Sequence, residues 1–238
     1  MTSISEVFLI KAPDNQKVNL WLFDGPGNWP EDGPGLFPAW LKPSKPDATQ
    51  VSLFGNKDKQ NVIVFLQGQA AEPCRKAGAE AYVLLKKLNL TDAKIWSNVE
   101  NSESVLAFAE GLVLASYRFD KYKSEKEKGL KKVEIFHSGL DKKEVKNLNT
   151  ICQAVNLTRN LVNEPASHLT AKKLSEIFEK TGKECGFEVE VMGENKIQSL
   201  KMGGLLGVNQ GSDLPPTFNI FEYKGKHAKN KKPIVLVG

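Results

Sequence analysis

Short hydrophobic runs and segments with helical spacing alternate along the first part of the chain. The runs predict strands, which fall at residues 18–23, 51–54, 61–66, 93–96 and 132–136. The run at 61–66 is apolar on both faces, as in a central strand. Helical spacing marks residues 74–88, a stretch from Ser104 to Tyr117 with Ser104 as the expected N-cap, and a helix from about residue 142. Strands that alternate with helices predict an α/β domain with a largely parallel sheet.

A joint between two helices follows at residues 160–170. Before it, apolar residues recur with helical spacing at Leu148, Ile151, Cys152, Val155 and Val162, and after it at Ala171, Leu174, Ile177 and Phe178. Pro165 disfavours helix at Glu164 and lacks an N–H, so it is expected to stop the first helix. Thr170 is placed as the N-cap of the second. We interpret the joint as the entrance to a second domain.

Beyond the joint, the second helix is expected to end near Gly186, a plausible residue for the left-handed turn that closes a helix. A strand at 187–191 and a short helix at 194–201 follow. Apolar segments predict further strands at residues 204–208, 217–223 and 233–237. The last is continuously apolar and is expected inside a covered sheet. Nothing follows it that would cover its face, so the second domain looks unfinished.

Composition and charge are those of an ordinary globular protein. The 238 residues carry a formal net charge of +5, from 33 basic and 28 acidic residues. The lysines are interleaved with acidic residues, which favours a solvated surface. We therefore expect that a nucleic-acid partner is unlikely for this chain. Three cysteines without a C-x-x-C pair indicate a reducing cytoplasm, and Cys152 is expected to be a small buried hydrophobe. No secretory signal and no membrane-spanning run is present, so no membrane partner is expected.

The residues alone offer no credible catalytic set. His137, His168 and His227 are scattered and do not have metal-ligand spacing. No G-x-S-x-G elbow is present, and Glu188 and Glu190 alternate with apolar residues as the solvent face of a strand. The long Gly/Pro-rich loop at residues 24–47 is functional or mobile, but its Gly-Pro-Gly pieces lack both the spacing and the N–H donors of a phosphate cradle.

Five segments in order resemble the leucine aminopeptidase family of metallopeptidases (M17, the cytosol aminopeptidases). They are EGLVLASYRFDKYK at 110–123, NLTRNLVNEPASHLT at 156–170, the Gly-rich stretch at 202–216, FEYKG at 221–225, and PIVLVG at 233–238. The resemblance implies an N-terminal macro-like α/β domain, expected over residues 1–145. It also implies the first part of an α/β metallopeptidase catalytic domain, expected over residues 146–238.

Family members are typically homohexamers that remove N-terminal residues from peptides with two divalent metal ions, commonly manganese, zinc or magnesium. Such a metal pair can activate a bridging hydroxide and polarise the scissile carbonyl. The resemblance implies that the metal ligands begin in a K-G-x-T-F-D-S-G-G motif after the strand that here ends at Gly238, one residue before its lysine. No catalytic, cofactor-binding or metal-ligating residue of the family can therefore be assigned to this chain. We expect the chain alone to be inactive and to bind no paired metals.

Two other functions remain open from the sequence. The macro-like domain could be a nucleotide or ADP-ribose binding module, or a regulatory one, without peptidase activity, its long Gly/Pro loop contacting the ligand. A DNA-binding role is the weaker alternative, because the basic excess is slight.

Overall fold

The computed structural model describes residues 5–11, 19–24, 49–55, 60–126, 128–230 and 232–238. It divides into two compact units, Met1–Val162 and Asn163–Gly238. The expected domain boundary between residues 145 and 146 concerns the family's architecture and stays a prediction.

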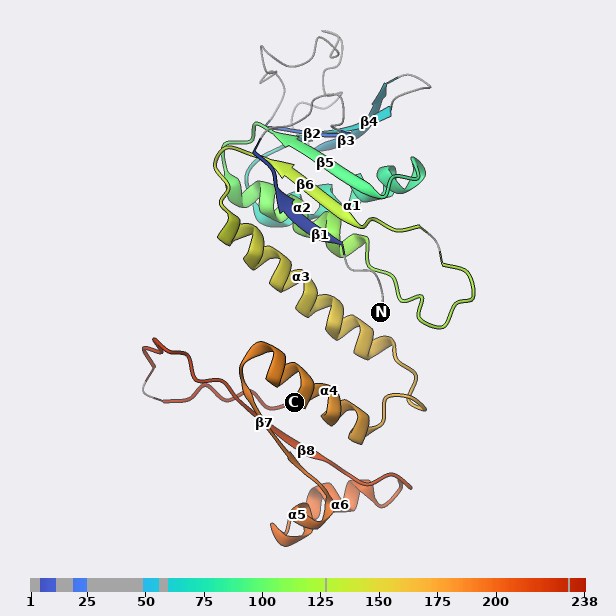
Figure 1. Ribbon diagram of the computed structural model, residues 1–238, viewed down its shortest axis with the longest axis vertical. Helices are drawn as coiled ribbons and strands as arrows, with labels where there is room; N and C mark the ends of the chain where they lie inside the picture. The colour runs from blue at the N-terminus through green and yellow to red at the C-terminus, as the bar shows by residue number, and fades with distance from the viewer. Residues whose placement is uncertain (1–4, 12–18, 25–48, 56–59, 127, 231) are drawn as a thin grey trace. The chain divides into compact units, whose positions relative to one another are not determined.

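The first unit is built on a six-stranded sheet with the strand order β1-β6-β5-β2-β4-β3 (Figure 1). Its strands are β1 (Glu6–Leu9), β2 (Leu20–Asp24), β3 (Gln50–Gly55), β4 (Gln60–Leu66), β5 (Asp92–Ser97) and β6 (Lys132–Phe136). All neighbouring strands run parallel except β3, which pairs antiparallel with β4. The structure thus confirms the predicted α/β class with a largely parallel sheet. Residues 61–66 of β4 are all buried, as expected of an interior strand.

Helices α1 (Ala71–Lys87) and α2 (Ser102–Ala115) cover one face of this sheet (Figure 1). Alternate strand positions point into the core that they close, because successive side chains of a strand lie on opposite faces. Those positions are Leu20, Leu22, Val62, Val64, Leu66, Ala93, Ile95, Val133 and Ile135. The intervening positions form a largely aromatic cluster on the other face: Trp21, Phe23, Ile63 and Phe65.

Two glycines let α1 and α2 approach closely. A Cβ on Gly111 would lie 2.0 Å from the carbonyl oxygen of Arg75, and one on Gly78 would lie 2.1 Å from that of Phe108. Real Cβ atoms do not make such contacts, so each helix needs glycine where the other crosses it. Beside the crossing, Arg75 Nε donates to Glu110 Oε2 at 2.8 Å. The ion pair therefore joins the same two helices that the glycines bring together.

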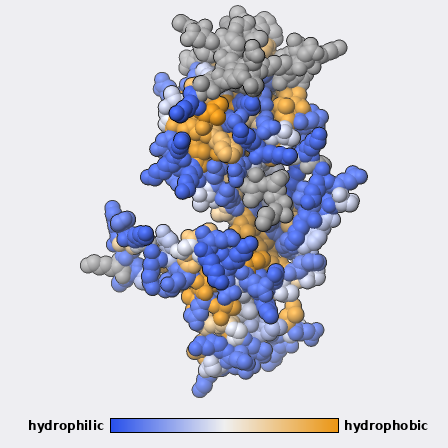
Figure 2. Space-filling view, viewed as in Figure 1, coloured by the Kyte–Doolittle hydropathy of each residue, from blue (hydrophilic) through white to orange (hydrophobic). Residues whose placement is uncertain are grey.

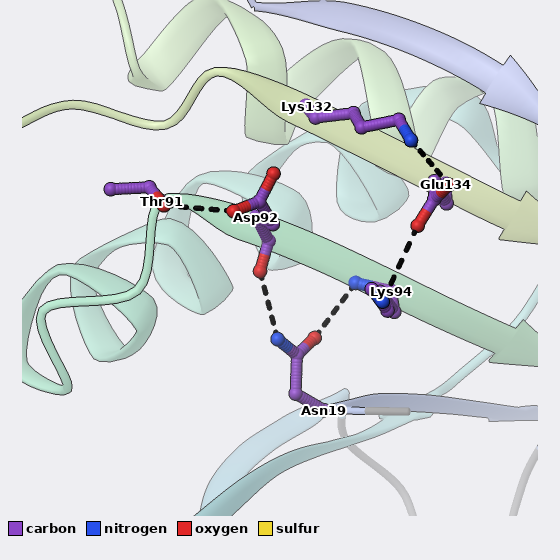
Figure 3. Close-up of polar contacts among 6 residues, drawn as sticks. All are labelled: Asn19, Thr91, Asp92, Lys94, Lys132 and Glu134. Atoms are coloured by element: carbon purple, nitrogen blue, oxygen red, sulfur yellow. Dashed lines mark hydrogen bonds and ion pairs between the residues drawn. The ribbon is translucent and has the colours of Figure 1, made fainter. Parts of the chain in front are cut away.

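An asparagine side chain just before β2 fastens it to β5. Asn19 Nδ2 donates to the carbonyl oxygen of Asp92 at 2.8 Å, and its Oδ1 accepts from the N–H of Lys94 at 2.7 Å (Figure 3). The amide makes the pair of hydrogen bonds that a neighbouring strand would make. Figure 3 also shows Glu134 of β6 between two lysines, with Lys132 Nζ at 2.6 Å and Lys94 Nζ at 3.7 Å.

A second asparagine does the same for the edge strand β1, which the sequence pattern did not reveal. Asn149 Oδ1 accepts from the N–H of Val7 at 2.9 Å, and its Nδ2 donates to the carbonyl oxygen of Val7 at 2.8 Å. Asn149 lies on α3 (Lys142–Asn163), whose start is fixed by a reciprocal capping box. Glu144 N donates to Asp141 Oδ1 at 2.7 Å, and Asp141 N to Glu144 Oε2 at 2.9 Å.

One detail of the predicted helices was wrong. The N-cap of α2 is Asn101, whose side chain accepts from Glu103 N, while Ser104 is fully buried and donates to the carbonyl oxygen of Gln69 at 3.2 Å. The helix starts a turn earlier because Asn101 satisfies its first free N–H. The predicted helix through Leu148, Cys152 and Val162 is α3, on which Leu148 and Cys152 are buried, whereas Ile151 and Val162 are 52% and 79% exposed.

The second unit contains α4 (Ala171–Cys185), β7 (Glu188–Met192), α5 (Glu194–Ser199), α6 (Gly203–Asn209) and β8 (Phe218–Glu222). Strands β7 and β8 pair antiparallel, and α4 packs on them with Phe178 and Phe221 in an edge-on ring contact at 4.9 Å. Both ends of α4 are as predicted. Thr170 Oγ1 accepts from Lys173 N at 3.3 Å, and Gly186 adopts the left-handed conformation at φ 79°.

Two strand predictions in this unit were wrong. Residues 204–208 lie within helix α6, and residues 233–238 form no strand. Ile234, Val235, Leu236 and Val237 are instead 73–94% exposed. A strand requires a partner strand for its backbone groups, and among the described residues of this unit only β7 and β8 pair. The hydrophobicity of these residues predicted a buried strand, but hydrophobicity carries no information on whether a partner strand is present.

Candidate functional site

The carboxyl edge of the parallel strands is where sheets of this kind bind ligands, so its residues are the first candidates. The carboxyl ends of five parallel strands, β1, β2, β4, β5 and β6, lie at this edge in the first unit. Asp24 ends β2, residues 67–70 follow β4, residues 98–101 follow β5, and residues 137–139 follow β6. The rest of the Gly/Pro-rich loop, residues 25–47, lies outside the described residues. The nucleotide hypothesis that rests on it stays a hypothesis.

His137 joins two of these loops as a buried hydrogen-bonding group. The N–H of Gly139 donates to His137 Nδ1 at 3.1 Å, so this nitrogen accepts. Nε2 therefore carries the proton and donates to the carbonyl oxygen of Val99 at 2.6 Å. With both ring nitrogens engaged and only 7% of the residue exposed, His137 holds the loop after β6 against the loop after β5.

The polar groups at the start of α2 also serve the fold. Asn101 Oδ1 accepts from Glu103 N at 2.9 Å, and its Nδ2 donates to Gln69 Oε1 at 3.3 Å. The carbonyl oxygen of Gln69 receives the bond from Ser104 already described. These contacts tie the β4–α1 loop to the β5–α2 loop. Asn101, Gln69 and Ser104 thus form hydrogen bonds with other protein groups at the edge where a ligand would bind.

Burial makes the two core cysteines unreactive. Desolvation raises the pKa of the Cys74 thiol, and it raises the pKa of the Cys152 thiol from 9.0 to about 11. The nearby Glu110 carboxylate adds to the shift at Cys152. Both thiols therefore stay protonated near neutral pH, whereas Cys185 is exposed. The prediction that Cys152 is a small buried hydrophobe is confirmed.

The joint after α3 is a tight turn held by its own backbone. The carbonyl oxygen of Pro165 accepts from the N–H groups of His168 at 2.8 Å and Leu169 at 3.0 Å. His168 Nδ1 lies 3.1 Å from Ser167 Oγ. The predicted roles of Pro165 and Thr170 are thus observed: α3 ends at Asn163, and Thr170 caps α4.

The three histidines lie in three different loops: His137 follows β6, His168 is in the joint between α3 and α4, and His227 is in the lysine-rich segment after β8. Within the described ranges, no group of three His, Cys, Asp or Glu side chains is arranged to hold a metal ion. Nor does any helix of those ranges have the length and apolar character needed to cross a membrane. The polar groups described above have structural roles. Asn19 and Asn149 were not predicted from the sequence, because an asparagine before a strand or on a helix has no distinctive sequence pattern.

Two sequence models of one family match the chain in order. The model of the "Cytosol aminopeptidase family, N-terminal domain" matches residues 54–126, and that of the "Cytosol aminopeptidase family, catalytic domain" matches residues 156–238. This chain belongs to the cytosol aminopeptidase family. The catalytic-domain match begins inside the last turns of α3 and includes the whole joint.

Curated relatives agree with this assignment, and solved structures share the fold. A "Probable cytosol aminopeptidase" of a Sulfurihydrogenibium species is 35% identical over 202 residues, covering 80% of this chain and 38% of its own length. A mutant of tomato leucine aminopeptidase has the same fold, with a TM-score of 0.76 at 19% identity over 97% of this chain and 53% of its own. The bottromycin maturation enzyme BotP, solved in complex with Mn, has a TM-score of 0.67 at 22% identity, covering 88% of this chain and 46% of its own. The chain therefore spans about two fifths to one half of the length of these proteins.

Proposed function

We propose that these residues are the N-terminal part of a metal-dependent leucyl aminopeptidase, which removes N-terminal residues from peptides. The observation that carries the proposal is the order of the two family matches, N-terminal domain then catalytic domain, with the joint and its expected helix stop and N-cap inside the catalytic-domain match. By analogy with the relatives named cytosol aminopeptidase, we infer that the whole protein acts in the cytoplasm, and by resemblance that it forms homohexamers.

The metal requirement is part of the proposal and is supported by the manganese complex of BotP. Two divalent ions would supply an activated hydroxide and a polarised carbonyl when bound. The described residues do not form a ligand set for them, and the motif that the resemblance assigns to the ligands does not occur in this sequence. We therefore assign this chain the supporting role: α3, the joint and α4 form the entrance to the catalytic domain.

A chimera tests this role. Residues 1–238 are joined to the remaining C-terminal part of the Sulfurihydrogenibium relative, and hydrolysis of leucyl-p-nitroanilide is measured with added manganese. The expected result is metal-dependent hydrolysis that EDTA abolishes. A chimera that folds as a soluble oligomer and stays inactive, while the complete relative is active under the same conditions, would count against the proposal.

ADP-ribose titration separates the alternative function. The carboxyl-edge groups that are described bond to one another, which favours no saturable heat with residues 1–238. Saturable binding of ADP-ribose at a 1:1 ratio would instead support a macro-like binding module.

A further inference from the structure

Helix α3 belongs to the first unit by its packing and partly to the catalytic domain by its sequence. Residues 142–162 of this one continuous helix lie in the first compact unit (Figure 1), yet the catalytic-domain match begins at residue 156. The last two turns, residues 156–162, are therefore catalytic-domain sequence held by the first unit. Whatever holds these turns also determines where the turn of the joint begins, because α3 ends at Asn163.

The buried apolar contacts of α3 are confined to its first part. Its buried hydrophobic residues are Val145, Leu148 and Cys152, all of which belong to the core cluster of the first unit. Along α3, all of which the structure describes, the only buried side chain beyond Cys152 is the polar Asn156. Apolar packing therefore does not by itself fix the last two turns, and a different kind of contact holds them.

Arg159 makes that contact with the end of α2. Its Nη1 donates to the carbonyl oxygen of Leu114 at 2.6 Å, and its guanidinium lies over the ring of Tyr117, 5.3 Å from the ring centroid. Leu114 is in the last turn of α2, where carbonyl oxygens lack partners within the helix and the helix dipole favours a cation. Tyr117 Oη also donates to Asn160 Oδ1 at 3.0 Å, which adds a second bond between the same two segments.

This use of a basic residue is unlike that of most lysines in the chain. Most lysines in the described ranges are exposed, and hydrophilic residues cover most of the face shown in Figure 2. Such charges contribute little to the stability of a fold, because water and salt screen them. Arg159 is half-buried and its donor meets a backbone oxygen. A hydrogen bond of this kind constrains direction, whereas apolar contact is non-directional.

We propose that Arg159, with Tyr117 packed against its guanidinium, is a positioning residue of the peptidase. It fixes the last two turns of α3 and thereby sets where the catalytic domain begins; this role rests on the proposed aminopeptidase function. A tilt of about 10° about Cys152 would move Asn163 by about 3 Å, since eleven residues at about 1.5 Å each separate them. The tight turn of the joint would pass that shift on to α4. Shifts of about 1 Å far from the chemistry can lower a rate by about a hundredfold.

Hydrogen exchange of the 238-residue chain tests the first step. Arg159→Met removes the guanidinium but keeps a long side chain, and the amides of residues 156–161 are expected to exchange about tenfold faster, because a hydrogen bond from a charged donor is lost. Lys146→Met removes a positive charge from an exposed position of the same helix and should leave these amides unchanged. Arg159→Lys keeps a cation at the end of α2 and is expected to restore much of the protection. Unchanged exchange in Arg159→Met would overturn the proposal.

The chimera with the Sulfurihydrogenibium relative tests the second step. Its Arg159→Met variant is expected to have a KM for leucyl-p-nitroanilide raised about threefold or more at saturating manganese, with partial recovery in Arg159→Lys. KM does not depend on how much of the protein is folded, so simple destabilisation would not move it. An inactive parent chimera would count against the proposed function and against this role with it. An active parent chimera whose Arg159→Met variant keeps the same KM would overturn the positioning role alone.

Discussion

Gly111→Ala tests the closest contact in the first unit. The added methyl carbon would lie 2.0 Å from the carbonyl oxygen of Arg75 and 2.6 Å from its carbonyl carbon. Because both neighbours are backbone atoms, no side-chain rotation can relieve the clash. Helices α1 and α2 must separate by about 1.4 Å to bring the 2.0 Å contact to the 3.4 Å of an ordinary contact. That separation would loosen the packing of Phe108 and Leu112, which are fully buried beside the crossing.

The magnitude follows from two opposing effects. Overpacking a core costs about 1–3 kcal/mol, and a backbone-to-backbone clash lies at the upper end of that range. Alanine regains about 1 kcal/mol over glycine in helix propensity. The net loss is about 2 kcal/mol, which for a unit of this size lowers the melting temperature by about 4–8 °C.

Tryptophan fluorescence reports this unit selectively, because the four tryptophans are Trp21, Trp29, Trp40 and Trp96, all before residue 100. Thermal melts of the wild-type chain and of Gly111→Ala would be compared by this signal. Gly204→Ala is the control, since Gly204 also lies in a helix and nothing is within 4 Å of its position. A melting temperature of Gly111→Ala within about 1 °C of wild type would refute the close crossing of α1 and α2.

Two further predictions concern the first unit. Asn149→Leu removes both hydrogen bonds to the backbone of Val7 and leaves those groups unpaired, so we expect the free energy of unfolding, measured with denaturant, to fall by about 2–3 kcal/mol. Thr150→Ala, at an exposed position of the same helix, should change that free energy by about 0.5 kcal/mol or less, and equal effects of the two variants would contradict the role of Asn149 in holding β1. For the cysteines, mass spectrometry after iodoacetamide treatment at pH 8 should show one modification per native chain, at Cys185, and three in denaturant. Because the pKa of Cys152 is about 11 in the folded chain and 9.0 unperturbed, the unfolded chain releases its proton first as pH rises from 9 to 11. Stability should therefore fall over that window, and a Cys152→Ala variant should lose less; modification of Cys152 in the native chain at pH 8 would contradict its burial.

Elements that are specified by a local residue pattern could be predicted from the sequence. Residues 61–66 are apolar on both faces and lie between two strands, and Pro165, Thr170 and Gly186 mark the helix ends found around them. These features depend on local backbone chemistry and on a simple period.

Elements that depend on a distant partner could not be predicted in the same way. Strand β1 has four residues and is held by Asn149, more than a hundred positions away. The approach of Gly78 and Gly111 depends on how two helices cross. Residues 204–208 and 233–237 have the composition of strands, but neither pairs with a strand in the described part of the second unit. The candidate site shares this limit, because a hydrogen bond such as that of His137 to Val99 joins two loops that no spacing rule connects.

Hydrolysis of leucyl-p-nitroanilide by the purified 238-residue chain, with manganese added, tests the central claim most directly. Our account predicts a rate equal to that of the protein-free blank, because the family's metal ligands are assigned to a motif that this sequence does not contain. Manganese-dependent hydrolysis that co-purifies with the chain, scales with its concentration and disappears with EDTA would contradict it.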